Sequence, residues 1–243
     1  MKKSMVAALI GLAVGLGSVS NSQAEENARS WNWSPLGIGI AAPLQLPFMD
    51  SDIYGMRMGG LFAFNNDVYG LDVGLVEVSA GYVSGLQVAG YTWTEGDFNG
   101  MRLGAIANVT LGSVYGIDVG LVNVAYGEVW GLQFGGINYA SGFCGIQFAG
   151  SVNWNESLSA GCQVAPVNAD QDDFEGISIG LVNYANTFAG CAVGLVNVSN
   201  DVVGFQLGLF NACTRMHGMQ IGLLNVIETS PRLPIMVIAN AMF

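Results

Sequence analysis

Twelve glycines recur along this chain at intervals of 14 to 16 residues, and this spacing constrains the fold more than any other feature. The anchor glycines are Gly55, Gly70, Gly85, Gly100, Gly116, Gly131, Gly145, Gly161, Gly176, Gly190, Gly204 and Gly218. A near-constant interval of this length indicates one small structural unit repeated in tandem. We therefore expect residues 53–228 to form an array of twelve repeats.

The four positions after each anchor glycine alternate in character. The first and third are apolar or cysteine in every repeat, the second is polar in eleven of twelve, and the fourth is always Gly or Ala. A period of two is typical of a β-strand, whose successive side chains point to opposite faces. We expect the first and third positions to be buried, and the second to be exposed or to face a lumen. The small fourth residue indicates a close approach of another segment.

An asparagine follows the anchor by seven or eight residues in nine repeats. These residues are Asn108, Asn123, Asn138, Asn153, Asn168, Asn183, Asn197, Asn211 and Asn225. Asn favours turns because its side chain bonds to nearby backbone and tolerates positive φ. The pattern therefore predicts all-β, strand–turn repeats, with a bulge or corner where the offset is eight.

The two ends of the chain differ from the repeats. Residues 1–24 read as a signal peptide, with two lysines, an apolar run and a small-residue cleavage pattern. Residues 25–52 form an N-terminal extension and closing strand, and residues 229–243 form a C-terminal closing strand that ends in Phe. The signal predicts export, which in a Gram-negative bacterium leads to the periplasm, the outer membrane or the cell surface.

Charge restricts the partners of the mature chain. Removing the signal leaves five arginines and no lysine against eighteen Asp and Glu. Such an acidic chain is not expected to neutralise the phosphates of nucleic acid. Half of the residues are apolar, so the chain must place an apolar face in a core, in lipid or against other subunits.

Two main architectures fit a twelvefold strand repeat. In a closed barrel-like ring, repeats pair edge to edge until residues 35–47 meet residues 234–243. In a parallel β-solenoid, repeats stack as coils around a narrow core. Both terminal runs are apolar and bracketed by proline, so each would leave an exposed edge unless they covered one another. We therefore expect the closed ring, with the solenoid as the alternative.

The four cysteines allow two interpretations. Cys162 and Cys191 occupy the apolar position directly after an anchor, and we place Cys144 and Cys213 on the same face. They are therefore expected to be small buried hydrophobes, or to include a disulfide between Cys144 and Cys162 of adjacent repeats.

Motifs that suggest chemistry belong to the repeat. Residues 176–180 fit G-x-S-x-G, but Ser178 occupies the repeat's polar position and no helix signal follows it. His217 is the chain's single histidine, and it precedes an anchor like Tyr and Trp elsewhere. We therefore predict no enzymatic activity, no catalytic residue and no cofactor.

One acidic segment is a weak candidate for a metal site. Calcium takes several carboxylate oxygens, and Asp170, Asp172, Asp173 and Glu175 lie within six residues. Their spacing matches no established calcium loop, so a solvated turn is the favoured interpretation.

The unit resembles a family of bacterial exported proteins. As written in residues 116–125, GIDVGLVNVA, and residues 204–212, GFQLGLFNA, it is similar to the surface-repeat-containing proteins of leptospires and other Gram-negative bacteria. It also resembles the shallow barrels called β-flowers. The resemblance implies export and a surface location, and it carries over no catalytic residue.

The expected function is therefore a structural or binding role for an exported surface or outer-membrane-associated protein. Its expected partners are membrane or lipid, or other surface proteins. Two alternatives remain: a lipid- or hydrophobe-binding β-shell with an apolar lumen, and an outer-membrane β-barrel channel.

Overall fold

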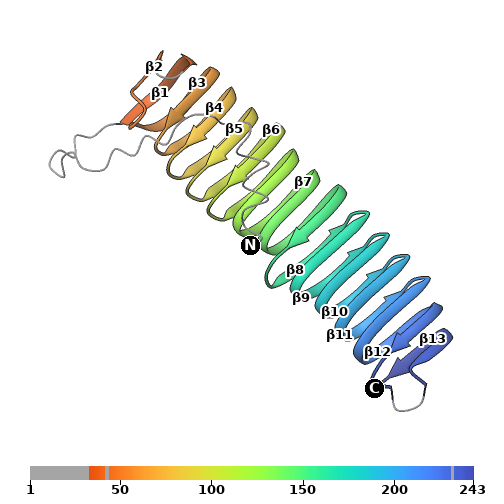
Figure 1. Cartoon of the computed structure of the whole chain (residues 1–243). Helices are drawn as coiled ribbons and strands as arrows, with labels where there is room; N and C mark the ends of the chain where they lie inside the picture. The colour runs from red at the N-terminus through yellow and green to blue at the C-terminus, as the bar shows by residue number, and fades with distance from the viewer. Residues whose placement is uncertain (1–32, 42–43, 231–232) are drawn as a thin grey trace, which may run out of the picture. The chain divides into compact units, whose positions relative to one another are not determined.

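The computed structural model describes residues 33–41, 44–230 and 233–243, and these residues contain strands and no helix (Figure 1). The signal peptide predicted at 1–24 lies outside them. The strands are β1 (Trp33–Ala41), β2 (Leu44–Leu46), β3 (Asp52–Asn65), β4 (Val68–Ser79), β5 (Val83–Thr94), β6 (Phe98–Thr110), β7 (Val114–Asn155), β8 (Ser159–Val164), β9 (Val167–Ile179), β10 (Val182–Val193), β11 (Val196–Leu207), β12 (Phe210–Ile227) and β13 (Ile235–Met242). The all-β prediction is confirmed.

Successive repeats stack side by side in parallel, as Figure 1 shows from β3 to β12. The register is one repeat: Gly190 lies opposite Gly204, and Gly204 lies opposite Gly218. The fold is therefore the parallel β-solenoid of our alternative, and the closed barrel-like ring is wrong. Parallel neighbours require a return path between equivalent strands, whereas a hairpin connection would make them antiparallel. The 14–16-residue repeat supplies both a strand and its return.

Each coil consists of two arms and two turns. In the coil anchored at Gly190, a first arm covers residues 188–193 and a second arm covers residues 196–199. At the turn between them, Leu195 N–H donates to Leu181 O of the preceding coil over 3.0 Å. Backbone hydrogen bonds thus link the coils at the turns as well as along the arms. β7 contains several arms because its strand pairing continues through the turns.

The anchor glycines form a column of kinks in the first arm. Their φ angles lie between +129° and +147°, where residues with a Cβ are strained. A Cβ at Gly161 would lie 2.0 Å from the carbonyl oxygen of Gly145, the anchor of the preceding coil. The repeat therefore requires glycine both for its conformation and for the spacing between coils.

The side chains point in the opposite direction from our prediction. The polar second position faces the interior: Gln147 is 0% exposed, while its neighbours Ile146 and Phe148 are 44% and 48% exposed. The alternation was correct, and the assignment of its faces was wrong. Apolar residues were expected inside because burial of apolar surface usually drives folding. Here the interior holds one apolar column beside columns of mainly polar side chains, many of which bond to one another.

The terminal strands do not meet. β1 pairs in parallel with β3, and β2 pairs with β1, at the start of the strand order. β13 pairs antiparallel with β12 at its other end, so the predicted pairing of residues 35–47 with 234–243 is wrong. The first and last strands instead cover the two ends of the stack.

Replacing Gly161 with Ala should lower the free energy of unfolding by more than about 2 kcal/mol, because alanine is strained at this φ and its Cβ meets a backbone oxygen. Gly150→Ala is the matched control, since its new Cβ would find its nearest heavy atom 3.8 Å away. Urea unfolding monitored by circular dichroism measures both. Equal midpoints for the two variants would contradict the role of the anchor column.

Candidate functional site

Four columns of side chains fill the interior between the two arms. The first arm contributes the residue two before the anchor and the residue two after it, and the second arm contributes two further positions. The first column is apolar in eleven coils, with Phe98, Val114 and Phe174 all nearly unexposed. The remaining columns are mainly polar or small. The coil interior is thus a narrow, mixed core in which polar side chains need internal partners.

The central feature of this interior is a ladder of asparagines. From Asn108 to Asn225, each Nδ2 donates to Oδ1 of the asparagine in the next coil over 2.8–3.0 Å. Thr92 Oγ1 donates to Asn108 Oδ1 over 3.0 Å and extends the ladder by one coil. These amides are 0–3% exposed. A continuous ladder satisfies them without water, so it replaces solvation by bonding along the stack.

The ladder also fixes the turn at the end of the first arm. Asn168 Nδ2 donates to Ile179 O over 2.9 Å, and Asn197 Nδ2 donates to Leu207 O over 3.0 Å. Each of these Asn side chains therefore donates to a backbone carbonyl of the following coil. That carbonyl belongs to the residue directly before the Gly or Ala position. At Gly120 a Cβ would lie 2.8 Å from both Asn108 Nδ2 and Asn123 Oδ1. This confirms the predicted close approach at the Gly and Ala column.

The two arginines of the interior, Arg57 and Arg102, are paired with the carboxylates of Asp72 and Asp118. Arg57 donates through Nε and Nη2 to the two carboxylate oxygens of Asp72 over 2.7 and 2.6 Å, and Gln87 Nε2 donates to Asp72 Oδ2 over 2.7 Å. Glu77 lies 3.1 Å from Arg57 Nε. Burial, followed by repulsion from Asp72, raises the pKa of Glu77 to about 8 against the opposing effect of Arg57. Near neutral pH the cluster is therefore an arginine–aspartate pair beside a mainly protonated glutamate.

The acidic segment proposed for calcium is divided between two faces. Asp170 is buried and accepts bonds from Asn155 Nδ2 and Gln163 Nε2, each over 2.9 Å. Asp172, Asp173 and Glu175 are exposed on the outside of the coil. The described residues contain no group of three or more His, Cys, Asp or Glu side chains that could hold a metal ion. Burial raises the pKa of Asp170 to about 6, while its bonds to Gln163 and Asn155 oppose this.

The four cysteines are free and do not share one face. Cys144 lies opposite Ala160, and Cys162 lies opposite Ile146, so the disulfide considered between Cys144 and Cys162 is not formed. Cys144, Cys162 and Cys191 are half-buried, whereas Cys213 is buried in the interior, where Gln220 Nε2 donates to its sulfur over 3.3 Å. The expectation of small buried hydrophobes on one apolar face is therefore met in burial by Cys213 alone, which lies on the interior side, while Cys144, Cys162 and Cys191 are half-buried on the outward side.

Ser178 and His217 take part in packing. Ser178 is 2% exposed, and its hydroxyl donates to Asn183 Oδ1 over 2.9 Å. The ring of His217 packs edge-on against Phe243, with centroids 6.3 Å apart. The two side chains therefore have different partners. Because interior polar groups such as Ser178 are closed to solvent, they offer no surface that a substrate could reach.

The outside of the solenoid is apolar on three sides. The first-arm face carries the first and third residues after each anchor, and the second-arm face carries the outward residues of the return arm, such as Val182. The third side, the leucine edge, is the turn that joins the two arms within a coil. Eight of its twelve turns carry a large apolar side chain that is 48–66% exposed: Leu61, Leu75, Ile106, Leu121, Leu181, Leu195, Leu209 and Leu223. The other four turns carry Gly90, Gly136, Ser151 and Pro166.

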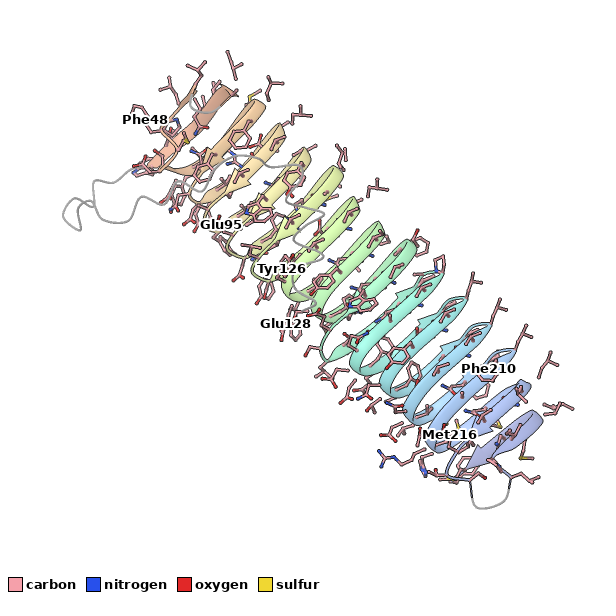
Figure 2. The ribbon with its side chains drawn as sticks, in the orientation of Figure 1. Phe48, Glu95, Tyr126, Glu128, Phe210 and Met216 are labelled. Atoms are coloured by element: carbon pink, nitrogen blue, oxygen red, sulfur yellow. The ribbon has the colours of Figure 1, made fainter. Side chains whose placement is uncertain are left out.

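The fourth side carries the exterior charge. We call the turns that join one coil to the next the acidic edge, and Figure 2 shows oxygen atoms gathered along it near Glu95 and Glu128. Its described acids are Asp50, Asp52, Asp67, Glu95, Asp97, Glu128, Glu156, Asp172, Asp173, Asp201 and Glu228, with Glu175 beside them. Arg215, which pairs with Asp201, is the one exposed Lys or Arg in the described part of the chain. The outer surface therefore has one acidic side and three apolar sides.

Comparisons with protein-family models, curated proteins and solved structures found no match. The resemblance to exported surface-repeat proteins therefore stays a prediction. No helix in the described ranges is long and apolar enough to cross a membrane.

The asparagine ladder is the main feature that sequence reasoning missed. Asn was interpreted as a turn former, yet nine repeats carry Asn itself where Asp, Ser or Gly would serve a turn equally well. An amide has two N–H groups and an acceptor oxygen, so it can donate to the next coil and to a turn carbonyl while it accepts from the preceding coil. A hydroxyl has only one hydrogen to donate, and an ionised Asp has none. The restriction to Asn was the available signal.

Replacing Asn168 with Leu should lower the free energy of unfolding by about 2–3 kcal/mol, because three interior hydrogen bonds of roughly 1 kcal/mol each are lost. Asn153 Nδ2 loses its acceptor in the ladder, and Asn183 Oδ1 and Ile179 O each lose one of their two donors. Asn200→Leu is the control because Asn200 is exposed. A loss no larger than that of the control, measured by urea unfolding, would show that the ladder contributes little.

Asp170→Asn should stabilise the chain at pH 8 by about 1–3 kcal/mol and have no effect near pH 4. The folded-state pKa of Asp170, about 6, lies above its ordinary value of 3.8, so the folded chain binds this proton more tightly. Its contribution to stability therefore falls as pH rises through this window. Asparagine keeps the oxygen that accepts from Asn155 and Gln163.

The measurement is the difference in unfolding free energy between wild type and Asp170→Asn at several pH values, with the exposed Asp172→Asn as control. A difference that does not change with pH would contradict a raised pKa.

Proposed function

We propose that this protein is a non-enzymatic, exported structural protein that associates with the outer membrane by binding lipid through its outer surface. The observation that carries this proposal is the inverted distribution of side chains. Amides and paired charges occupy the interior, while Leu, Ile, Val, Met and Phe cover three sides of the exterior. A stack that remained in water would expose these apolar side chains along its whole length.

The free energy involved is large. Fully burying one Leu, Ile or Phe side chain contributes about 1.5–3 kcal/mol. Dozens of large apolar side chains are exposed here, among them Phe148 at 48%, Leu181 at 55% and Leu223 at 66%. Contiguous apolar surface of this extent marks an interaction site for membrane or protein. Lipid contact would therefore provide a strong driving force for association.

The backbone is compatible with an apolar surrounding. Hydrocarbon offers no hydrogen bonds, so a structure in contact with it must satisfy its N–H and C=O groups internally. Each coil between β3 and β12 bonds to the coil before and the coil after it. Among the described strands, β2 and β13 keep an unpaired side at the two ends of the stack. Lateral hydrogen bonding is thus complete along most of the array.

The two alternatives from the sequence depended on a different geometry. A lipid-binding shell needs an inward apolar lining around a wide lumen, whereas the interior here is narrow and largely polar. A channel needs a closed barrel, which the chain does not form. Nucleic acid is also disfavoured as a partner, because the exposed charge is almost entirely acidic.

The purified chain should float with phosphatidylcholine vesicles in a sucrose gradient, because transfer of its apolar exterior from water to lipid lowers the free energy. Replacing Leu181, Leu195, Leu209 and Leu223 with Ser should reduce the floated fraction, since these exposed residues contribute little to the interior of the coil. Circular dichroism of this variant checks that the β-structure is retained. A monomer that stays at the bottom with vesicles present would overturn the proposal.

A further inference from the structure

Tryptophan and tyrosine are concentrated beside the acidic edge. Eleven of the twelve described Trp and Tyr residues lie in its turns or at the outward positions next to them; Tyr91 is the exception. On the first arm these positions carry Tyr54, Tyr69, Tyr115 and Trp130, and on the second arm they carry Trp93, Tyr139, Trp154 and Tyr184. We call these eight residues the aromatic belt. It occupies four of the twelve coils on each face, and in the last three coils these positions carry other residues, such as Ala189, Val203 and Val198.

One belt residue bonds directly to the charged side: Trp130 Nε1 donates to Glu128 Oε2 over 2.9 Å, and Figure 2 shows Tyr126 beside Glu128 along the same edge. Phenylalanine, which has no polar atom, is not confined to this zone. Outward-facing Phe134 and Phe148 lie three residues past their anchors, farther from the acidic edge, whereas Phe64 occupies the belt position of the second arm. The surface thus grades from charged, through amphipathic aromatic, to purely apolar.

This gradation matches the depth profile of a lipid bilayer. Trp and Tyr concentrate where headgroups meet hydrocarbon, because one end of the ring is apolar and the other is wet. Charged groups remain in water, and aliphatic groups enter the hydrocarbon. The coils that carry the belt show these three zones in this order, on both faces.

A protein partner explains the surface less well. A sheet that packs on a face lies about 10 Å from it and covers that face alone. It would leave the other face and the leucine edge exposed, where Leu195 and Leu209 are 48% and 53% accessible. A fluid hydrocarbon phase contacts two faces and a narrow edge at once. We therefore identify the occupant as lipid.

The dimensions are of the order of one leaflet. From the belt to the leucine edge the chain advances six to seven residues along the first arm, which is kinked at its anchor glycine, and three residues along the second arm. At roughly 3.3 Å per residue these are at most about 20–23 Å and about 10 Å. The hydrocarbon of one leaflet is about 15 Å thick. Inserted to its belt, the solenoid would reach approximately the middle of the bilayer.

We propose that the solenoid lies edge-on in one leaflet of a bilayer, with the stack parallel to the membrane plane. The acidic edge is in water, the aromatic belt is at the headgroups, and the leucine edge is near the bilayer centre. This orientation rests on the proposed lipid association and adds a direction and a depth to it. With its acidic edge outside, the protein favours neutral or zwitterionic lipid over anionic lipid.

Four positions in neighbouring coils test the orientation. The parent variant has all four cysteines replaced by Ala, which already occupies the interior column of Cys213 at Ala125, Ala140 and Ala185. Single cysteines labelled with the fluorophore NBD are then introduced as Asn200→Cys on the acidic edge, Leu195→Cys on the leucine edge, Leu207→Cys on the first-arm face and Val182→Cys on the second-arm face. Phosphatidylcholine vesicles carry lipids brominated at different acyl depths.

Edge-on insertion predicts blue-shifted, strongly quenched emission at positions 195, 207 and 182, and unchanged emission at 200. Bromines near the acyl ends should quench position 195 most. Quenching of only one of the two faces would overturn the edge-on orientation, as would equal quenching at 195 and 200. If the chain does not bind the vesicles at all, the proposed function itself fails, so the two failures are distinguishable.

Matched double variants test the belt. Trp130→Leu with Trp154→Leu should weaken vesicle binding several-fold, because Leu lacks the indole N–H suited to the headgroup region. Phe134→Leu with Phe148→Leu should leave binding nearly unchanged, since these sites exchange one apolar side chain for another. Exposure is similar in both sets, 49% and 40% for the tryptophans against 39% and 48% for the phenylalanines. Equal losses in the two variants would contradict an interfacial role for the belt.

Discussion

Hydrogen bonding between asparagine amides of successive coils is the interaction on which this structure depends. An amide has both a donor and an acceptor, so an Asn at one position of every coil can bond forward and backward without limit. The ladder from Asn108 to Asn225 does this, and it also bonds to carbonyls at the turn of the following coil. Asparagine therefore links neighbouring coils and donates to buried backbone carbonyls at the turn. It also requires a small residue beside it.

The ladder has consequences for the exterior. Because polar side chains fill most of the space between the arms, the apolar residues on the alternate positions must face outward. The acids that remain outside lie along one edge, where the chain passes from one coil to the next. The chain thus combines a largely polar interior, in which the asparagine amides satisfy one another, with an exterior divided into one acidic side and three apolar sides. Lipid association follows from this division, and it requires no catalytic group.

Several features were predictable from sequence for clear reasons. The anchor interval predicted the repeat, because a unit with conserved backbone geometry needs glycine at the same point each time; Gly161 and its equivalents have positive φ. Period-two alternation predicted strands, and the Gly and Ala column predicted the close approach seen at Gly120. The placement of Asp170 inside and Asp172 outside was not predictable, because adjacent acids look alike until the direction of the strand is known.

The sequence by itself determined that the chain forms twelve strand–turn units with two chemically different faces. Local periodicity specifies strand geometry, but it does not show which face of the strand is enclosed. The tertiary structure decided three things: that neighbouring units pair in parallel as a solenoid, that residues 35–47 and 234–243 lie at opposite ends of the strand order, and that Gln147 is inside while Ile146 is outside. These depend on bonds between residues 14 to 16 positions apart, such as the one from Asn153 to Asn168, which exist only once the coils have stacked.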